Sequence, residues 1–490
     1  MVNISQELET ELIKRRAVSG VVTLTLRTIF VQIFTFFGTF MLTILLSPEI
    51  FGIFFVVSAI LNFFVYFSDI GLAAALVQKK DEPTRQDLVS TFTIQQAIIF
   101  FLLFIGLIFS SKIAQFYNLD KEGLLLLRVL IFSLVLSSLK TIPSIILERK
   151  LNFTRLILPQ IAENLIFYSV AVILAYLNFG ISAFSWAVLA RGFIGLILIY
   201  ILSPWKPGIG INLENARKLI SFGIPFQTNS LLALAKDDLL TIFLGKILSF
   251  AQIGYVGWAQ KWSLLPIRFV VDNVNRVTFP AYSRLQSQKY ELGKAIEKSL
   301  FFVTYLAYPS IFGMIAVAPK LLEVIPRYQK WEPALPLLYL FAINAVFSAV
   351  STTFTNTLFA LGKPKIVLNF MILWTSATWI LTYPLVLIYG YIGVGIASAL
   401  VAMTSIATIY FVKKEVKITV GRNIFGPLLI SSLMCLIVRL ITSTYVSNIV
   451  GLALTIILGA FIYLALSISI LRKHLLEDAK IIVKALIFNK

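Results

Sequence analysis

The sequence predicts an all-α membrane protein that crosses the bilayer about 14 times. The first observation is composition: 59% of the 490 residues are hydrophobic, only 13% are charged, and the mean hydropathy is +0.91. A soluble chain of this length needs more charge to cover its surface. The second observation is a series of long apolar stretches, each close to the roughly 20 residues that span a bilayer as a helix. A transmembrane β-barrel would instead show short alternating segments.

Fourteen apolar stretches are long enough to be membrane-spanning helices. They cover residues 20–46, 51–77, 89–110, 123–147, 156–177, 181–202, 220–245, 252–279, 299–319, 334–361, 366–389, 391–412, 424–443 and 446–471. Residues 1–19 form a charged interfacial segment before them. Residues 472–490 follow as a tail whose apolar positions recur as one stripe, which predicts an amphipathic helix on the membrane surface.

Lysine and arginine are distributed unevenly between the two sides of the membrane. With the N-terminus inside, the predicted cytoplasmic segments contain 27 of these residues and the predicted outer loops contain 6. This difference follows the positive-inside rule and places both termini in the cytoplasm. The net charge of +19 therefore reflects membrane topology, and we do not expect nucleic acid as a partner.

The chain divides into two halves at a segment of low hydrophobicity. Residues 203–219 contain two prolines and two glycines near the middle of the first twelve spans, which predicts a cytoplasmic linker. It separates an N-lobe, residues 20–202, from a C-lobe, residues 220–412. The last two spans, residues 413–471, lie outside the two halves.

Two short matches suggest that the halves are repeats. Residues 46–52 and 248–254 share the pattern Leu-Ser-x-x-x-(Phe/Ile)-Gly at an offset of 202 residues. Residues 180–183 (GISA) match residues 393–396 (GVGI) at an offset of 213. Both matches join segments of the same orientation, which predicts a parallel repeat about an axis along the membrane normal.

The sequence contains hardly any cysteine or histidine. Cys435 is the one cysteine and His474 the one histidine, so an intramolecular disulfide and a histidine-based zinc site in the membrane are both excluded. No GxxxxGK[ST] phosphate loop is present. We therefore expect no catalytic residues, no metal and no cofactor, and we interpret the chain as a non-enzyme.

The charge within the membrane is concentrated in residues 221–280. Lys236, Asp237 and Asp238 lie in the first predicted span of this stretch. In the second span, Lys261, Arg268 and Asp272 fall within about 40° of one another on a helix at about 100° per residue, with Arg276 slightly further round. Charge at this depth costs at least about 2.5 to 3.5 kcal/mol per residue. The stretch is therefore predicted to line a polar cavity.

Cations outnumber acids among the predicted spans. The nine cations are Arg27, Arg128, Lys140, Arg191, Lys236, Lys261, Arg268, Arg276 and Arg439. The five acids are Asp69, Glu163, Asp237, Asp238 and Asp272. A cavity with surplus positive charge suits an anionic substrate such as a phosphate or a pyrophosphate.

Some of these charges have an alternative, purely structural role. Arg27 and Asp69 lie at a similar predicted depth in the membrane, as do Lys261 and either Asp237 or Asp238. The two opposite charges of each pair can therefore neutralise each other. Three cations lie close enough to span ends to reach water, namely Lys140, Arg276 and Arg439.

Two arginines remain as the favoured cavity residues. Arg191 has only Glu163 as an acid at a similar depth, and Arg268 has only Asp272. For both arginines we favour contact with substrate over simple neutralisation.

Three stretches resemble the polysaccharide and O-antigen flippases. Residues 45–80 resemble their second span, residues 236–286 their seventh and eighth spans, and residues 327–365 their tenth-span region. The resemblance implies the multidrug/oligosaccharidyl-lipid/polysaccharide exporter fold. That fold has two six-helix lobes related by a pseudo-two-fold axis, two additional C-terminal helices, and a central cavity that opens alternately to each side.

The resemblance also implies a function in the prokaryotic cytoplasmic (inner) membrane. The expected substrate is undecaprenyl-pyrophosphate-linked oligosaccharide for O-antigen, lipopolysaccharide, exopolysaccharide or a similar glycan. Membrane lipid and other polysaccharide-assembly membrane proteins are further candidate partners. The candidate substrate-binding cations are Arg27, Arg128, Arg191, Lys236, Lys261 and Arg268. The candidate acids for coupling to H⁺ or Na⁺ are Asp69, Glu163, Asp238 and Asp272.

Two other functions stay open at this point. A multidrug antiporter of the same fold would need an acidic cavity, with cation export dependent on Asp69 or Glu163. A membrane glycan polymerase or glycosyltransferase would need a catalytic carboxylate near an outer loop. The surplus of cations disfavours the first function, and the short outer loops disfavour the second.

Overall fold

The computed structural model describes residues 28, 30–68, 71–79, 81–212, 232 and 234–471. The described residues form helices and connecting turns, without a β-strand among them, which confirms the all-α fold class. The helices are α2 (Pro48–Ser68), α3 (Leu72–Gln78), α4 (Arg85–Tyr117), α5 (Lys121–Leu139), α6 (Thr141–Arg149), α7 (Phe153–Tyr176), α8 (Ser182–Leu202), α10 (Phe250–Leu285), α11 (Lys289–Val324), the 3-10 helix η1 (Gln329–Ala334), α12 (Leu335–Ala360), α13 (Pro364–Tyr389), α14 (Ile392–Thr404), α15 (Ala407–Glu415), α16 (Gly421–Tyr445) and α17 (Ile449–Ile470).

Eleven helical segments in the described part of the chain are long and apolar enough to cross a membrane. Three further helices account for the other predicted spans: Phe30–Leu45, residues 234–247, and α10. The chain is thus a multi-pass membrane protein. The predicted segments 1–19 and 472–490 lie outside the described residues.

The chain forms two compact units, Met1–Gly254 and Tyr255–Lys490. We call them unit 1 and unit 2. The boundary between them falls inside α10. The predicted lobes, residues 20–202 and 220–412, and the predicted repeat axis stay predictions.

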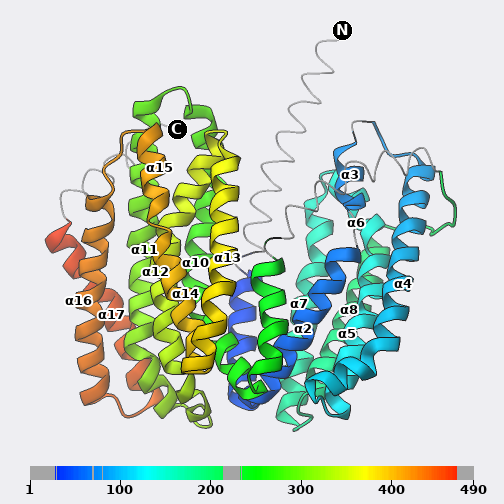
Figure 1. Ribbon diagram of the computed structural model, residues 1–490, viewed down its shortest axis with the longest axis horizontal. Coiled ribbons are helices and arrows are strands. Elements are labelled where there is room, and N and C mark those ends of the chain that lie inside the picture. The colour runs from blue at the N-terminus through cyan, green and yellow to red at the C-terminus, as the bar shows by residue number, and fades with distance from the viewer. Residues whose placement is uncertain are drawn as a thin grey trace. The chain divides into compact units, whose positions relative to one another are not determined.

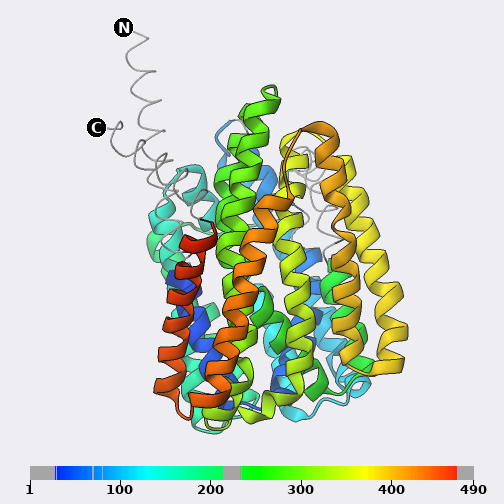
Figure 2. The ribbon, with the colours of Figure 1, turned by 90° about the vertical axis from the view of Figure 1, so that its left-hand side faces the viewer.

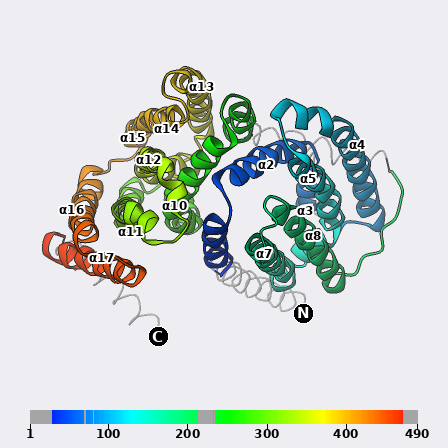
Figure 3. The ribbon, with the colours of Figure 1, turned by 90° about the horizontal axis from the view of Figure 1, so that it is seen from below.

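In unit 2, α12 lies between α11 and α14 (Figure 3). Its buried apolar side chains, among them Ala345, Ala349 and Phe354, form one core with Val271 of α10 and Tyr308 of α11. The C-terminal helices α16 and α17 pack against α11, as the orange, red and green ribbons of Figure 2 show. The core shared by Val271 and the α12 side chains, together with hydrogen bonds from Ser263 Oγ to the Leu338 carbonyl oxygen and from Asn356 to Asn275, puts α10 and α12 in contact within unit 2.

The predicted span 51–77 is wrong in one respect, because the helix is broken. α2 ends at Ser68, and α3 begins at Leu72 after Gly71, whose φ of 80° is left-handed. Glycine adopts this conformation without a Cβ penalty, so it can redirect the chain. α3 then packs beside α6 at one end of unit 1 (Figure 1), where Leu76 and Ile142 belong to one buried cluster.

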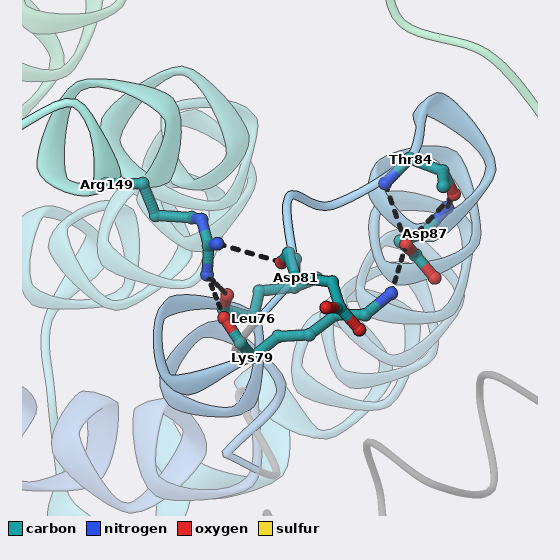
Figure 4. Close-up of polar contacts among 6 residues, drawn as sticks. All are labelled: Leu76, Lys79, Asp81, Thr84, Asp87 and Arg149. Atoms are coloured by element: carbon teal, nitrogen blue, oxygen red, sulfur yellow. Dashed lines mark hydrogen bonds and ion pairs between the residues drawn. The ribbon is translucent and has the colours of Figure 1, made fainter. Parts of the chain in front are cut away.

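Arg149, the last residue of α6, holds the end of α3 (Figure 4). Its Nη1 donates hydrogen bonds to the carbonyl oxygens of Leu76 (2.8 Å), Val77 (3.0 Å) and Lys79 (2.7 Å), and its Nη2 donates to that of Asp81 (2.9 Å). The last carbonyls of a helix have no partner within the helix. One guanidinium therefore satisfies the end of α3 and fastens it to α6.

A capping box starts α4 close to this contact. Thr84 Oγ1 accepts a hydrogen bond from the Asp87 N–H at 3.2 Å, and the Asp87 carboxylate accepts one from the Thr84 N–H at 2.8 Å. The same carboxylate pairs with Lys79 at 2.6 Å (Figure 4). These contacts begin α4 at Arg85, before the predicted residue 89, because the cap satisfies the first free N–H groups.

We expect Arg149→Lys to destabilise unit 1 by about 2 kcal/mol, since one ammonium cannot replace a fork that reaches four carbonyls. The thermal unfolding midpoint of the purified protein should fall. Arg155→Lys is the matched control, because Arg155 is exposed and the described structure gives its side chain no hydrogen bond. Equal midpoints for the two variants would contradict the role of Arg149.

The predicted linker lies along α4 where it is described. The N–H of Gly210 donates to Thr93 Oγ1 at 3.1 Å, and that of Asn212 donates to Ser90 Oγ at 2.9 Å. The Trp205 ring meets Phe92 of α4 at a centroid distance of 5.0 Å. Residues 203–212 thus follow one helix of unit 1, and residues 213–219 lie outside the described residues.

The two turns of the predicted repeat have the same backbone hydrogen bonds. The N–H of Leu46 donates to the carbonyl oxygen of Leu42 at 2.8 Å, and the N–H of Leu248 donates to the carbonyl oxygen of Leu244 at the same distance. The second sequence match has a different register, because the left-handed glycine that precedes α14 is Gly390. Gly390 corresponds to Gly180 before α8 at an offset of 210, not 213.

The two repeated turns also touch each other reciprocally within unit 1. A Cβ built on Gly52 would lie 1.8 Å from the carbonyl oxygen of Phe250. A Cβ built on Gly254 would lie 2.0 Å from that of Pro48. Because Pro48 and Phe250 are themselves separated by the repeat offset of 202, each turn makes the same contact with the other.

Candidate functional site

Four charged residues of α10 lie on one exposed face of the helix. Lys261, Arg268, Asp272 and Arg276 are all exposed, whereas Val271 is fully buried in the core of unit 2. The shared face predicted from helical spacing is therefore observed. Binding of substrate by this face stays a prediction.

Arg268 is not directly neutralised by its neighbour. Among the described residues, no ion pair within 4.0 Å links Arg268 to Asp272, although Asp272 lies one turn further along the same helix. Three cations and one carboxylate share the face. It can therefore accept an anion without first losing an ion pair between these two residues.

Uncharged polar residues continue this face, and the sequence interpretation missed them. Asn356 of α12 donates from Nδ2 to Asn275 Oδ1 and to Thr278 Oγ1 of α10, both at 3.3 Å. Asn275 falls about 20° from Arg268 on the helix. That angle was available from the sequence, but the approach of Asn356 was not.

In unit 1, Glu163 is paired with Lys140. Lys140 Nζ lies 2.7 Å from Glu163 Oε1, and the two side chains are only 17% and 19% exposed. A Cβ on Gly195 of α8 would lie 1.8 Å from the same carboxylate oxygen, so a side chain at this position would have to displace the carboxylate. Glu163, the one acid predicted at a depth similar to that of Arg191, is thus paired with Lys140.

Arg191 is instead placed against an aromatic ring. Its guanidinium carbon lies 5.3 Å from the centre of the Phe167 ring, in cation–π geometry. The side chain is exposed, and in the described part of the chain it has no acidic partner. A ring orients the guanidinium without consuming its N–H donors, so Arg191 stays available for an anion.

Asp238 has a neutral partner. Asn62 of α2 donates from Nδ2 to Asp238 Oδ1 at 2.8 Å. Asp238 and Lys236 are both half-buried, and Asp237 is exposed. The amide leaves the negative charge of Asp238 in place, as an acid that binds a coupling ion requires.

Arg128 is exposed and makes hydrogen bonds to hydroxyls of α4. Its Nε donates to Ser110 Oγ at 3.1 Å, and its Nη2 donates to Ser111 Oγ at 3.3 Å. These contacts join α5 to α4. Arg27 and Asp69 lie outside the described residues.

The described residues were also compared with the requirements of a metal site. Across the described residues, no group of three or more His, Cys, Asp or Glu side chains is placed to hold a metal ion.

Several proteins with similar sequences are named for their part in polysaccharide biosynthesis. The succinoglycan biosynthesis transport protein ExoT of Rhizobium meliloti (strain 1021) is 23% identical over 431 residues, covering 85% of each chain. The teichuronic acid biosynthesis protein TuaB of Bacillus subtilis (strain 168) is 21% identical, covering 72% of this chain and 71% of its own. The lipopolysaccharide biosynthesis protein WzxC of Escherichia coli (strain K12) is 24% identical over 42% of each chain.

Two solved structures share the fold. The lipid II flippase MurJ, in an inward closed conformation, superimposes with a TM-score of 0.72 at 17% identity, covering 93% of this chain and all of its own. An inward-facing multidrug transporter of the MATE family gives 0.60 at 13% identity, covering 77% of this chain and 94% of its own. A family described as polysaccharide biosynthesis protein matches residues 41–336. Since that match covers more than half of the sequence, the chain belongs to this family of polysaccharide biosynthesis proteins.

Proposed function

We propose that this protein is a secondary flippase that moves undecaprenyl-pyrophosphate-linked oligosaccharide from the inner to the outer leaflet of the cytoplasmic membrane. The observation that carries the proposal is the exposed face of α10, with three cations to one carboxylate. Membership of a polysaccharide biosynthesis family and the names of ExoT and MurJ support it.

The substrate chemistry explains why such a face is needed. A pyrophosphate and its sugars cannot cross hydrocarbon unaided, because desolvation of charged and polar groups costs too much. Arginine binds two phosphate oxygens at once through its planar fork. Arg268, exposed on α10, is the first candidate for this role, and Arg191 and Arg27 are further candidates. The prenyl tail stays in lipid during alternating access.

Energy for directional transport comes from an ion gradient, the membrane potential or removal of the product. Asp238 is the best-placed acid for H⁺ or Na⁺, because its observed partner is a neutral amide. Asp69 and Asp272 are further candidates. Glu163 is disfavoured, since its carboxylate is already paired with Lys140. Both termini face the cytoplasm in this proposal.

The test is transport by the purified protein in proteoliposomes. The probe is undecaprenyl pyrophosphate carrying a fluorescent oligosaccharide, and the measurement is the rate at which its sugars become accessible to an enzyme outside the vesicles. We expect protein-dependent translocation and no uptake of a cationic dye. Dye transport without oligosaccharide translocation would favour the antiporter and overturn the proposal. Cleavage or extension of the sugars by the protein alone would favour an enzyme.

A further inference from the structure

A cluster of amides and a hydroxyl lies where α10 meets α12 in unit 2. Asn275, Thr278 and Asn356 are all half-exposed, and they are joined only through the Asn356 amide N–H₂ group. Both hydrogen bonds are 3.3 Å long, at the weak end of the normal range. Such bonds can be exchanged for bonds to a ligand at little cost.

The cluster continues the charged face of α10. Asn275 is seven residues after Arg268, which places it about 20° round the helix and about 10 Å further along the axis. Asp272 lies between them on the same face. A molecule whose anionic group reaches Arg268 can therefore place its neighbouring group beside Asn275.

The cluster has unused hydrogen-bonding capacity. An asparagine side chain offers two N–H donors and an acceptor oxygen. Among the described residues, the Asn275 amide N–H₂ and the Asn356 amide oxygen have no hydrogen-bond partner. One donor group and one acceptor, both partly open to solvent, match a sugar hydroxyl, which donates and accepts. The cluster itself has no charge.

We propose that Asn275, Thr278 and Asn356 form a sugar subsite that hydrogen-bonds the first sugar of the lipid-linked oligosaccharide, next to the pyrophosphate. This inference rests on the proposed function and adds the residues that distinguish one glycan from another. A site built to bond a hydroxyl discriminates strongly against ligands that lack it, because its own polar groups are then left unpaired.

The same helix supplies a matched control. Asn273 is two residues from Asn275 but about 160° away from it around the helix. Its Nδ2 donates to the Phe269 carbonyl of α10 itself, at 2.7 Å. Asn273→Ala thus removes an identical side chain from the same helix without touching the sugar subsite.

The experiment compares binding of lipids with and without a sugar to the full-length protein in detergent. The probes are undecaprenyl pyrophosphate alone and the same lipid carrying one galactose, glucose or N-acetylglucosamine. We expect the wild-type protein to bind at least one sugar-bearing probe at least about fivefold more tightly than the sugar-free lipid. Asn275→Ala and Asn356→Ala should remove this difference and leave sugar-free binding unchanged, while Asn273→Ala keeps it.

Thr278→Val is a third variant, nearly isosteric, which protects the test if an asparagine variant fails to fold. It should reduce the preference for the sugar-bearing probe. The proposal is overturned if none of the three sugars tightens binding, or if the subsite variants weaken both kinds of probe equally. Arg268→Ala tests the pyrophosphate role separately from the sugar subsite. Loss of binding to the sugar-free lipid supports the pyrophosphate role, and unchanged binding refutes that role while the sugar preference is still read from the other variants.

Discussion

Arg268→Ala is expected to reduce translocation of undecaprenyl-pyrophosphate-linked oligosaccharide at least about 30-fold, with membrane insertion intact. Loss of one member of a desolvated, hydrogen-bonded charge pair typically costs about 2 kcal/mol or more, and here the other member is the pyrophosphate. Arg268→Lys keeps the charge but lacks the forked geometry, so transport should be substantially impaired as well. Folding should be preserved because Arg268 is exposed on α10.

The competing explanation is that Arg268 only neutralises Asp272. Under that explanation the double change Arg268→Ala with Asp272→Ala should restore transport, since no unpaired charge remains in the membrane. We expect no restoration, because these two residues form no ion pair within 4.0 Å in the described structure.

The measurement is translocation at matched expression. Arg284→Ala is the control, since Arg284 is an exposed arginine of the same helix that points about 160° away from Arg268. Near-normal transport by the double variant would refute the phosphate role of Arg268. An equal loss in Arg284→Ala would show that any lost cation on α10 has the same effect.

Gly52→Ala and Gly254→Ala should each strongly reduce the yield of folded protein and its thermal stability. The new methyl groups would lie 1.8 Å from the Phe250 carbonyl oxygen and 2.0 Å from that of Pro48. Both distances are far inside van der Waals contact, and both neighbours are backbone atoms that cannot rotate away as a side chain can. The two turns would have to separate, which exposes the buried Leu46 and Leu248 beside them.

Monodisperse yield and unfolding midpoint after detergent extraction provide the test. Gly313→Ala is the control, because a Cβ there meets only Met434 Cε at 3.7 Å, an ordinary contact. Alanine also favours the helix over glycine by about 1 kcal/mol, so this variant should be neutral or stabilised. Normal yield and stability of both turn variants would contradict the reciprocal contact.

Local pattern alone was sufficient for the fold class and for the face of α10. Apolar length predicts a membrane helix, and a fixed rotation of about 100° per residue determines that Lys261, Arg268 and Asp272 share a side. It also brings Asn275 onto that side. These features depend on residues close together in the chain, so no knowledge of neighbouring helices is required.

Tertiary structure alone decided which side chains meet across helices. Depth in the membrane left Glu163 as the one acid at a level similar to that of Arg191, whereas the folded chain brings Lys140 to its carboxylate, beside Gly195. Periodicity likewise could not bring Asn356 to Asn275. Contacts between residues far apart in sequence depend on which helices are neighbours and how each is rotated. Packing of the whole unit sets both, and the order of residues within one helix does not contain them.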